Sequence, residues 1–305
     1  MHKHFNPYDN PVLNGTASGG EGDESPATFN VLRWIMDVLA VLIKVVPLLL
    51  HIVLSTILLH NKNRYLSNSF YILIFILSIT VIIETTSTLV AMLLESSHLR
   101  VIYLMLTFLE YFTDSYTPCV VLLIGLNQMA VFSRGFLHYY VLKTRNLLIN
   151  ALILFGLAVF WSFTLAVVPY LITTTRGKKT FAELYIIISC IFHSLPILSF
   201  MLYLIAYVKM RSLSSSSVLP ATTYQFIMRV ERINLIQGFF VSLAYTISIS
   251  LDFLEGYVVD WSEYPAYIAG EIAEGVTGIA VPAMIFICAK HIRAGILSIL
   301  RLRKL

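Results

Sequence analysis

The sequence has few charged residues and few cysteines. Only 12% of its 305 residues are Asp, Glu, Lys or Arg, whereas soluble domains usually contain about 25%. Cys119, Cys190 and Cys288 all lie inside apolar stretches, which excludes the disulfide framework of a small secreted domain. The motifs His-Glu-x-x-His and Gly-x-Ser-x-Gly are absent from the sequence. We therefore expect no enzymatic activity, no metal, no cofactor and no nucleic-acid partner.

Hydrophobic residues make up 58% of the chain and gather in seven long segments. Each segment reaches the roughly 20 residues that an α-helix needs to cross about 30 Å of hydrocarbon. The sequence therefore predicts an all-α membrane protein with a seven-transmembrane helix bundle. The predicted spans are residues 35–59, 69–94, 102–132, 147–172, 184–208, 232–254 and 264–289.

The positions of the basic residues predict the orientation. With the N-terminus outside, the inner loops and tail hold 14 Lys and Arg and the outer segments hold six, as expected for cytoplasmic loops. The basic cluster at 176–179, in a predicted outer loop, is evidence against this orientation, but the inner residues outweigh it. We expect a disordered extracellular segment at 1–33 with a glycosylation sequon at Asn14. The bundle would cover 34–290, and 291–305 would form a basic amphipathic cytoplasmic tail.

Several ionisable residues inside the predicted spans share one depth. They lie roughly 10 to 18 Å below the outer surface, at a rise of ~1.5 Å per residue. Charged groups in hydrocarbon are costly unless they are paired, protonated or face water. We therefore predict one cavity, open to the outside, that binds a small cationic or hydrogen-bond-donating molecule. The candidate ligand-binding residues are Glu84, Glu110, Asp114, His193 and Glu274.

Aromatic side chains at Tyr111, Tyr245 and Trp161 would supply apolar walls for this cavity. A structural role is the alternative for each ionisable residue. In that case Lys44 forms a buried salt bridge with Glu84 or Glu274, and the other acids are protonated and hydrogen-bonded. We favour the cavity for the whole set because one lysine cannot pair with all these acids. For His193, with Cys190 and Pro196 nearby, helix packing is the more common role.

Three motifs at the inner ends of the spans carry a family resemblance. They are Lys-Asn-Arg-Tyr-Leu-Ser-Asn-Ser-Phe-Tyr at 62–71, Leu-Asn-Gln-Met-Ala-Val-Phe at 126–132 and Ala-Lys-His-Ile-Arg at 289–293. With seven spans and an external N-terminus, they resemble G-protein-coupled receptors and, more narrowly, nematode serpentine chemoreceptors of the gamma (srg) superfamily. The resemblance implies a plasma-membrane receptor of a sensory cell that binds a small external ligand and signals through a heterotrimeric G protein.

The resemblance also implies a G-protein-facing inner surface. Its candidates are Gln128, Arg134, Lys143, Arg145, Arg229 and Arg232. Alternatively, these basic residues only set the topology and contact anionic membrane lipid. The chain departs from the family where Gln128 replaces a common arginine, and the Asn-Pro-x-x-Tyr motif is absent around Pro282. A seven-span ligand-gated channel with an internal N-terminus, or less favourably a cation-coupled carrier, remains the alternative.

Overall fold

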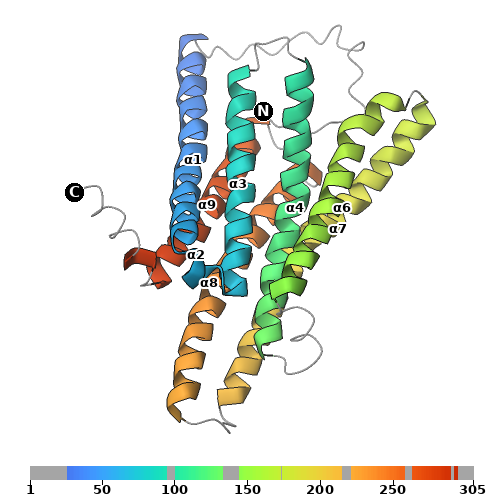
Figure 1. Cartoon of the computed structure of the whole chain (residues 1–305). Helices are drawn as coiled ribbons and strands as arrows, with labels where there is room; N and C mark the ends of the chain where they lie inside the picture. Colours follow the sequence, from blue (N-terminus) through green and yellow to red (C-terminus); the bar gives the residue numbers. More distant parts are fainter. Residues whose placement is uncertain are drawn as a thin grey trace.

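The computed structural model describes residues 26–94, 100–132, 144–172, 174–214, 221–257, 263–289 and 292–294. This part of the chain is helical and contains no strand (Figure 1). The helices are α1 (Pro26–His60), α2 (Lys62–Tyr65), α3 (Ser69–Leu94), α4 (Arg100–Phe132), α6 (Thr144–Leu171), α7 (Thr175–Ser214), α8 (Ala221–Tyr257) and α9 (Glu263–Cys288).

Within the described ranges, six helices are long and apolar enough to cross a membrane. Their spans are Val41–His60, Ser69–Leu94, Val101–Phe132, Asn146–Pro169, Thr175–Ser212 and Glu231–Leu251. The apolar part of α9, Ile272–Cys288, is shorter. The chain is thus an integral membrane protein with an all-α bundle, as predicted. The seventh crossing and the orientation of the termini remain predictions.

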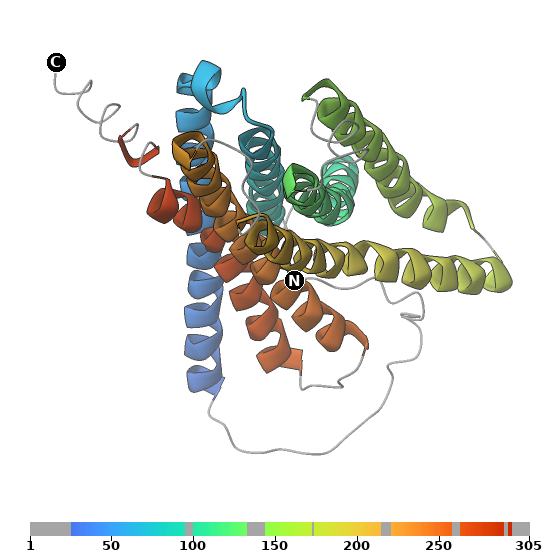
Figure 2. The ribbon, with the colours of Figure 1, turned by 90° about the horizontal axis from the view of Figure 1, so that it is seen from below.

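Helix α4 is the central element of the bundle. It packs against α3, α6, α7 and α8, while α1 packs against α3 and α9, and α8 against α7 and α9. The helices α1, α3, α4, α7, α8 and α9 therefore close a ring, and α6 lies on α4 outside it (Figures 1 and 2). Most of the apolar stretch of α4, 78%, is buried, against 11% for α7. The helix with the candidate residues Glu110 and Asp114 is thus enclosed by others.

Small residues allow close contact between α4, α7 and α8. A Cβ added at Gly125 would lie 2.5 Å from the Ser199 Oγ and 3.0 Å from its Cα. The Ser199 hydroxyl donates to the Val121 carbonyl at 2.8 Å and lies 2.9 Å from the Ser242 Oγ. A side chain at Gly238 would collide with the Tyr203 ring. Such small-residue contacts are the usual means by which helices associate in membranes.

The contact between α1 and α9 also depends on glycine. Gly278 packs against Pro47, where an added Cβ would lie 2.9 Å from the proline ring. The His51 Nε2 hydrogen-bonds the Gly278 carbonyl at 3.0 Å. One helical turn away, Gly275 packs against Ile43. These contacts fix the position of Lys44 relative to Glu274, which lie next to Ile43 and Gly275 in the sequence.

Several helices extend beyond the predicted spans. α1 begins at Pro26, within the segment predicted to be disordered, and α7 begins at Thr175. The basic residues at 176–179 therefore lie in the first turn of α7, and the prediction of a loop there was wrong. Hydropathy identifies only the part of a helix that crosses hydrocarbon, so it misses the polar ends of these helices. The start of α1 at Pro26 agrees with the preference of proline for the first turn of a helix. Asn14 and residues 295–305 lie outside the described ranges, so their predicted roles are untested.

Candidate functional site

A pocket of about 240 Å³ lies between the helices. All seven long helices of the described structure contribute to its wall, with α4 supplying the most residues. On α1, α4 and α9 the lining residues lie near the middle of each helix. We call this cavity the acidic pocket because Glu84, Glu110, Asp114 and Glu274 all line it.

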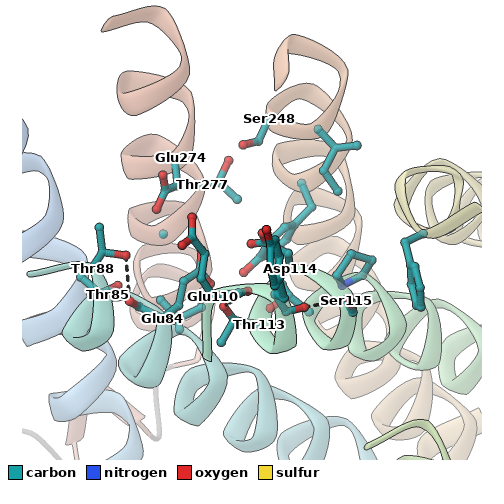
Figure 3. A pocket seen from close by; sticks show the side chains of 18 of the residues that line it. Glu84, Thr85, Thr88, Glu110, Thr113, Asp114, Ser115, Ser248, Glu274 and Thr277 are labelled. Atoms are coloured by element: carbon teal, nitrogen blue, oxygen red, sulfur yellow. Dashed lines mark hydrogen bonds between the residues drawn. The ribbon is translucent and has the colours of Figure 1, made fainter. Parts of the chain in front are cut away.

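The structure brings the five candidate ligand-binding residues together. Glu84 comes from α3, Glu110 and Asp114 from α4, His193 from α7 and Glu274 from α9. Figure 3 shows the four carboxylate residues around a common space, with Glu110 and Asp114 projecting from successive turns of α4. A cluster predicted from depth alone is therefore a cluster in space. Binding by these residues remains a prediction.

Lys44 forms an ion pair with Glu274. Its Nζ donates to both carboxylate oxygens at 3.1 Å, and Lys44 is only 3% exposed. The side chain of Glu274 is 36% exposed. The structural alternative is thus correct for this pair. Glu84, Glu110 and Asp114 have interactions of their own. Lys44 is the one Lys or Arg among the described lining residues, so acidic groups exceed basic ones in the pocket.

Hydroxyl groups in the pocket wall donate to backbone carbonyls. Thr88 donates to the Glu84 carbonyl at 3.0 Å, Thr113 to the Glu110 carbonyl at 2.9 Å and Ser115 to the Tyr111 carbonyl at 2.8 Å. A hydroxyl has only one proton, so each of these oxygens retains only its acceptor capacity. The polar wall therefore offers carboxylates and hydroxyl acceptors, and it suits a ligand that donates hydrogen bonds.

His193 is half-buried and lies beside this acceptor surface. Its Nδ1 is 2.6 Å from the Ser189 carbonyl, an atom that only accepts, so Nδ1 is the donor. In the neutral ring Nε2 is then an acceptor as well. This hydrogen bond stabilises one ring orientation of a residue whose role the sequence left open.

No family model matches the chain, and no curated protein matches it either. The resemblance to serpentine chemoreceptors stays a prediction, and function must be argued from the acidic pocket. Among the described residues, no group of three or more His, Cys, Asp or Glu side chains is arranged to hold a metal ion.

The aromatic wall includes residues that the sequence did not single out. The predicted Tyr111, Trp161 and Tyr245 line the pocket, and so do Tyr185 and Phe192 of α7. Spacing could have identified Tyr185, because a residue eight positions before His193 lies near the same helical face. Phe192 carries no such signal, because direct neighbours in a helix do not share a face. The hydroxyl residues of the wall carry no such signal, since Ser and Thr occur throughout these spans.

The inner candidates are less well defined by the structure. Gln128 is fully buried and its amide has no hydrogen-bond partner in the described structure. Contact of Gln128 with a G protein would therefore require the inner end of the bundle to open. Arg232 is exposed. Arg145 lies in α6 and Arg229 in α8, and the structure describes only the backbone of these two residues. Arg134 and Lys143 lie outside the described ranges altogether.

Proposed function

We propose that the protein is a seven-span plasma-membrane receptor that binds a small cationic molecule from outside and signals to a heterotrimeric G protein. One observation carries the proposal: four carboxylates converge on a pocket whose described lining contains one Lys or Arg, Lys44, so acidic groups outnumber basic ones there. Carboxylates inside a bilayer protein mark ligand or ion sites. The N-terminus would lie outside, the C-terminus inside, and the pocket in the outer half of the bundle.

The pocket wall supports a ligand that is both cationic and small. The hydroxyls of Thr88, Thr113 and Ser115 already donate to backbone carbonyls, so an ammonium group would find these oxygens as acceptors beside the carboxylates. Pockets for drug-sized ligands usually have volumes of about 300 to 1,000 Å³. The volume here, about 240 Å³, favours an amine smaller than such ligands or one that is only partly enclosed.

Tight packing below the pocket supports a receptor over a channel or carrier. Val120, Val121 and Ile124 of α4, Val241 of α8 and Val281 of α9 are all fully buried. These side chains belong to one buried apolar cluster and lie within two helical turns of the nearest pocket residues on their helices. An ion would have to pass through this cluster, whereas a receptor needs only a shift of packed helices. The resemblance to serpentine chemoreceptors adds to this proposal.

A cell-based assay tests the proposal. Cells expressing the protein are screened with small mono- and diamines while a second messenger is recorded. We expect a dose-dependent response that Asp114→Asn or Glu110→Gln shifts to at least tenfold higher amine concentration, because one charged hydrogen bond is worth about 1.5 to 3 kcal/mol. Surface expression is measured for each variant. Unchanged dose responses with normal expression would contradict the pocket assignment.

The same cells separate the alternative functions. Occupancy of Asn14 by a glycan, or an N-terminal tag readable on intact cells, supports the external N-terminus. A tag readable only after permeabilisation would instead favour the seven-span channel. Amine-induced current without second-messenger change would also favour the channel. Amine uptake into vesicles containing the purified protein would favour the carrier.

A further inference from the structure

We infer that the ligand is a lipophilic amine that reaches the acidic pocket from the bilayer between α6 and α7. Its ammonium group binds among the carboxylates, and its apolar part lies toward α6 and α7. This inference rests on the proposed cation pocket and specifies the ligand class and its route.

The first support is the packing of the two helices. α6 packs against α4, and α7 packs against α4 and α8, but α6 and α7 make no extended contact with each other in their described parts. Figure 2 shows them joined at one side of the bundle and diverging from there. Both nevertheless line the pocket, α6 through Trp161 and Leu165 and α7 through Phe192 and His193. The pocket is therefore lined by two helices that have no extended contact with each other in their described parts.

The second support is the surface beside His193. Three residues share one helical stripe with His193: Ile186 lies seven residues before it, Cys190 lies three before it, and Ile197 lies four after it. All three are exposed, Ile186 by 43% and Ile197 by 41%. His193 lies at the middle of the span Thr175–Ser212. At that depth an exposed side chain contacts hydrocarbon, so the pocket edge at His193 faces lipid.

The third support is the division of chemistry within the pocket. The carboxylates come from α3, α4 and α9, whereas α6 contributes the apolar side chains Trp161 and Leu165, and α7 contributes Tyr185 and Phe192 beside Ser189 and His193. A ligand that satisfies both parts has a cationic end and an apolar end. A volume of about 240 Å³ does not enclose a large apolar group, so a longer tail continues between α6 and α7 into lipid.

The experiment uses the full chain in lipid nanodiscs with one reporter. Trp34→Phe and Trp261→Phe leave Trp161, in the pocket wall, as the single tryptophan of three. Stopped-flow fluorescence then measures the association of n-octylamine, methylammonium and 1-octanol. Cys190→Phe adds bulk beside His193. Ile187→Phe is the matched control, because Ile187 is an exposed neighbour on the same helix but outside the stripe.

We expect saturable association of both amines and none of 1-octanol. Cys190→Phe should slow n-octylamine about tenfold or more, within the range that interface variants show, and leave methylammonium unchanged. Ile187→Phe should change neither rate. Equal effects of Cys190→Phe on both amines, or no effect on n-octylamine, would overturn the lipid route. Saturable binding of 1-octanol would overturn the amine as ligand. Failure of both amines to bind would refute the cation pocket itself.

Discussion

Removal of the positive charge of Lys44 should strengthen the binding of a cationic ligand. Lys44 is nearly fully buried and donates to both oxygens of Glu274 at 3.1 Å. The ammonium group of Lys44 is thus a cation of the protein itself, inside a pocket that we propose binds a cationic ligand. A ligand ammonium that binds to the same Glu274 carboxylate is repelled by the positive charge of Lys44. The substitution Lys44→Met removes that charge and keeps most of the side-chain volume.

The size of the effect follows from the ion-pair geometry. Two ammonium groups that each lie about 3 Å from one carboxylate are no more than roughly 6 Å apart, and at an effective dielectric constant of about 20 their repulsion is about 2.8 kcal/mol. Water in the pocket weakens this repulsion, since the Glu274 side chain is 36% exposed. We therefore expect Lys44→Met to improve affinity by about 1 to 2 kcal/mol, or about 5- to 30-fold.

Lys44→Arg is the matched control because it keeps the charge. Binding of methylammonium to purified Lys44→Met, Lys44→Arg and unmodified protein is followed by Trp161 fluorescence, and thermal unfolding shows whether each variant is folded. We expect the arginine variant to bind methylammonium as the unmodified protein does. Weaker binding of methylammonium by a folded Lys44→Met would refute the reasoning, because it would mean that the Lys44 charge does not repel the bound cation.

Two stability predictions concern the glycine contacts, and thermal unfolding of the detergent-solubilised protein tests both. Gly125→Ala should lower the unfolding free energy by about 1 to 3 kcal/mol, since its Cβ meets the Ser199 backbone. Gly156→Ala is the control, because nothing lies within 4 Å of the added Cβ, and it should raise the unfolding free energy by about 0.5 to 1 kcal/mol. Equal effects of Gly125→Ala and Gly156→Ala would contradict the close contact of Gly125 with Ser199. Gly278→Ala should cost about 1 to 3 kcal/mol, because the Pro47 ring cannot yield; an unchanged melting temperature would mean that α1 moves away freely.

Much of the bundle could be predicted because hydrocarbon imposes a simple rule. A span needs about 20 apolar residues, and six predicted segments coincide with helices able to cross a membrane. The seventh predicted segment, 264–289, coincides with α9 (Glu263–Cys288), of which Ile272–Cys288 forms the shorter apolar part among the described residues. The helix ends could not be predicted from hydropathy. Outside the hydrocarbon, polar residues are compatible with helix and loop alike, as the first turn of α7 shows.

The site could be predicted in part for a related reason. Buried charge is expensive, so Glu84, Glu110, Asp114 and Glu274 stood out in the sequence, and the structure places all four on one pocket. The partner of Lys44 could not be chosen between Glu84 and Glu274, because that choice depends on the close approach of α1 to α9. Neutral wall residues such as Phe192 carry no comparable cost in hydrocarbon, so nothing in the sequence separated them from lipid-facing residues.

The contacts just below the pocket determine how a bound ligand would affect the inner end. Ser199 bonds to α4 at Val121 and lies within hydrogen-bond distance of α8 at Ser242, and Gly125 leaves no free space beside it. A ligand that moves α4 against α7 must break these contacts or carry α8 along with α4 and α7. Because packed interfaces change between discrete arrangements rather than deform gradually, the result would be a shift of α8 as a unit. Gln128, buried with an unpartnered amide, lies on α4 where such a shift would expose it.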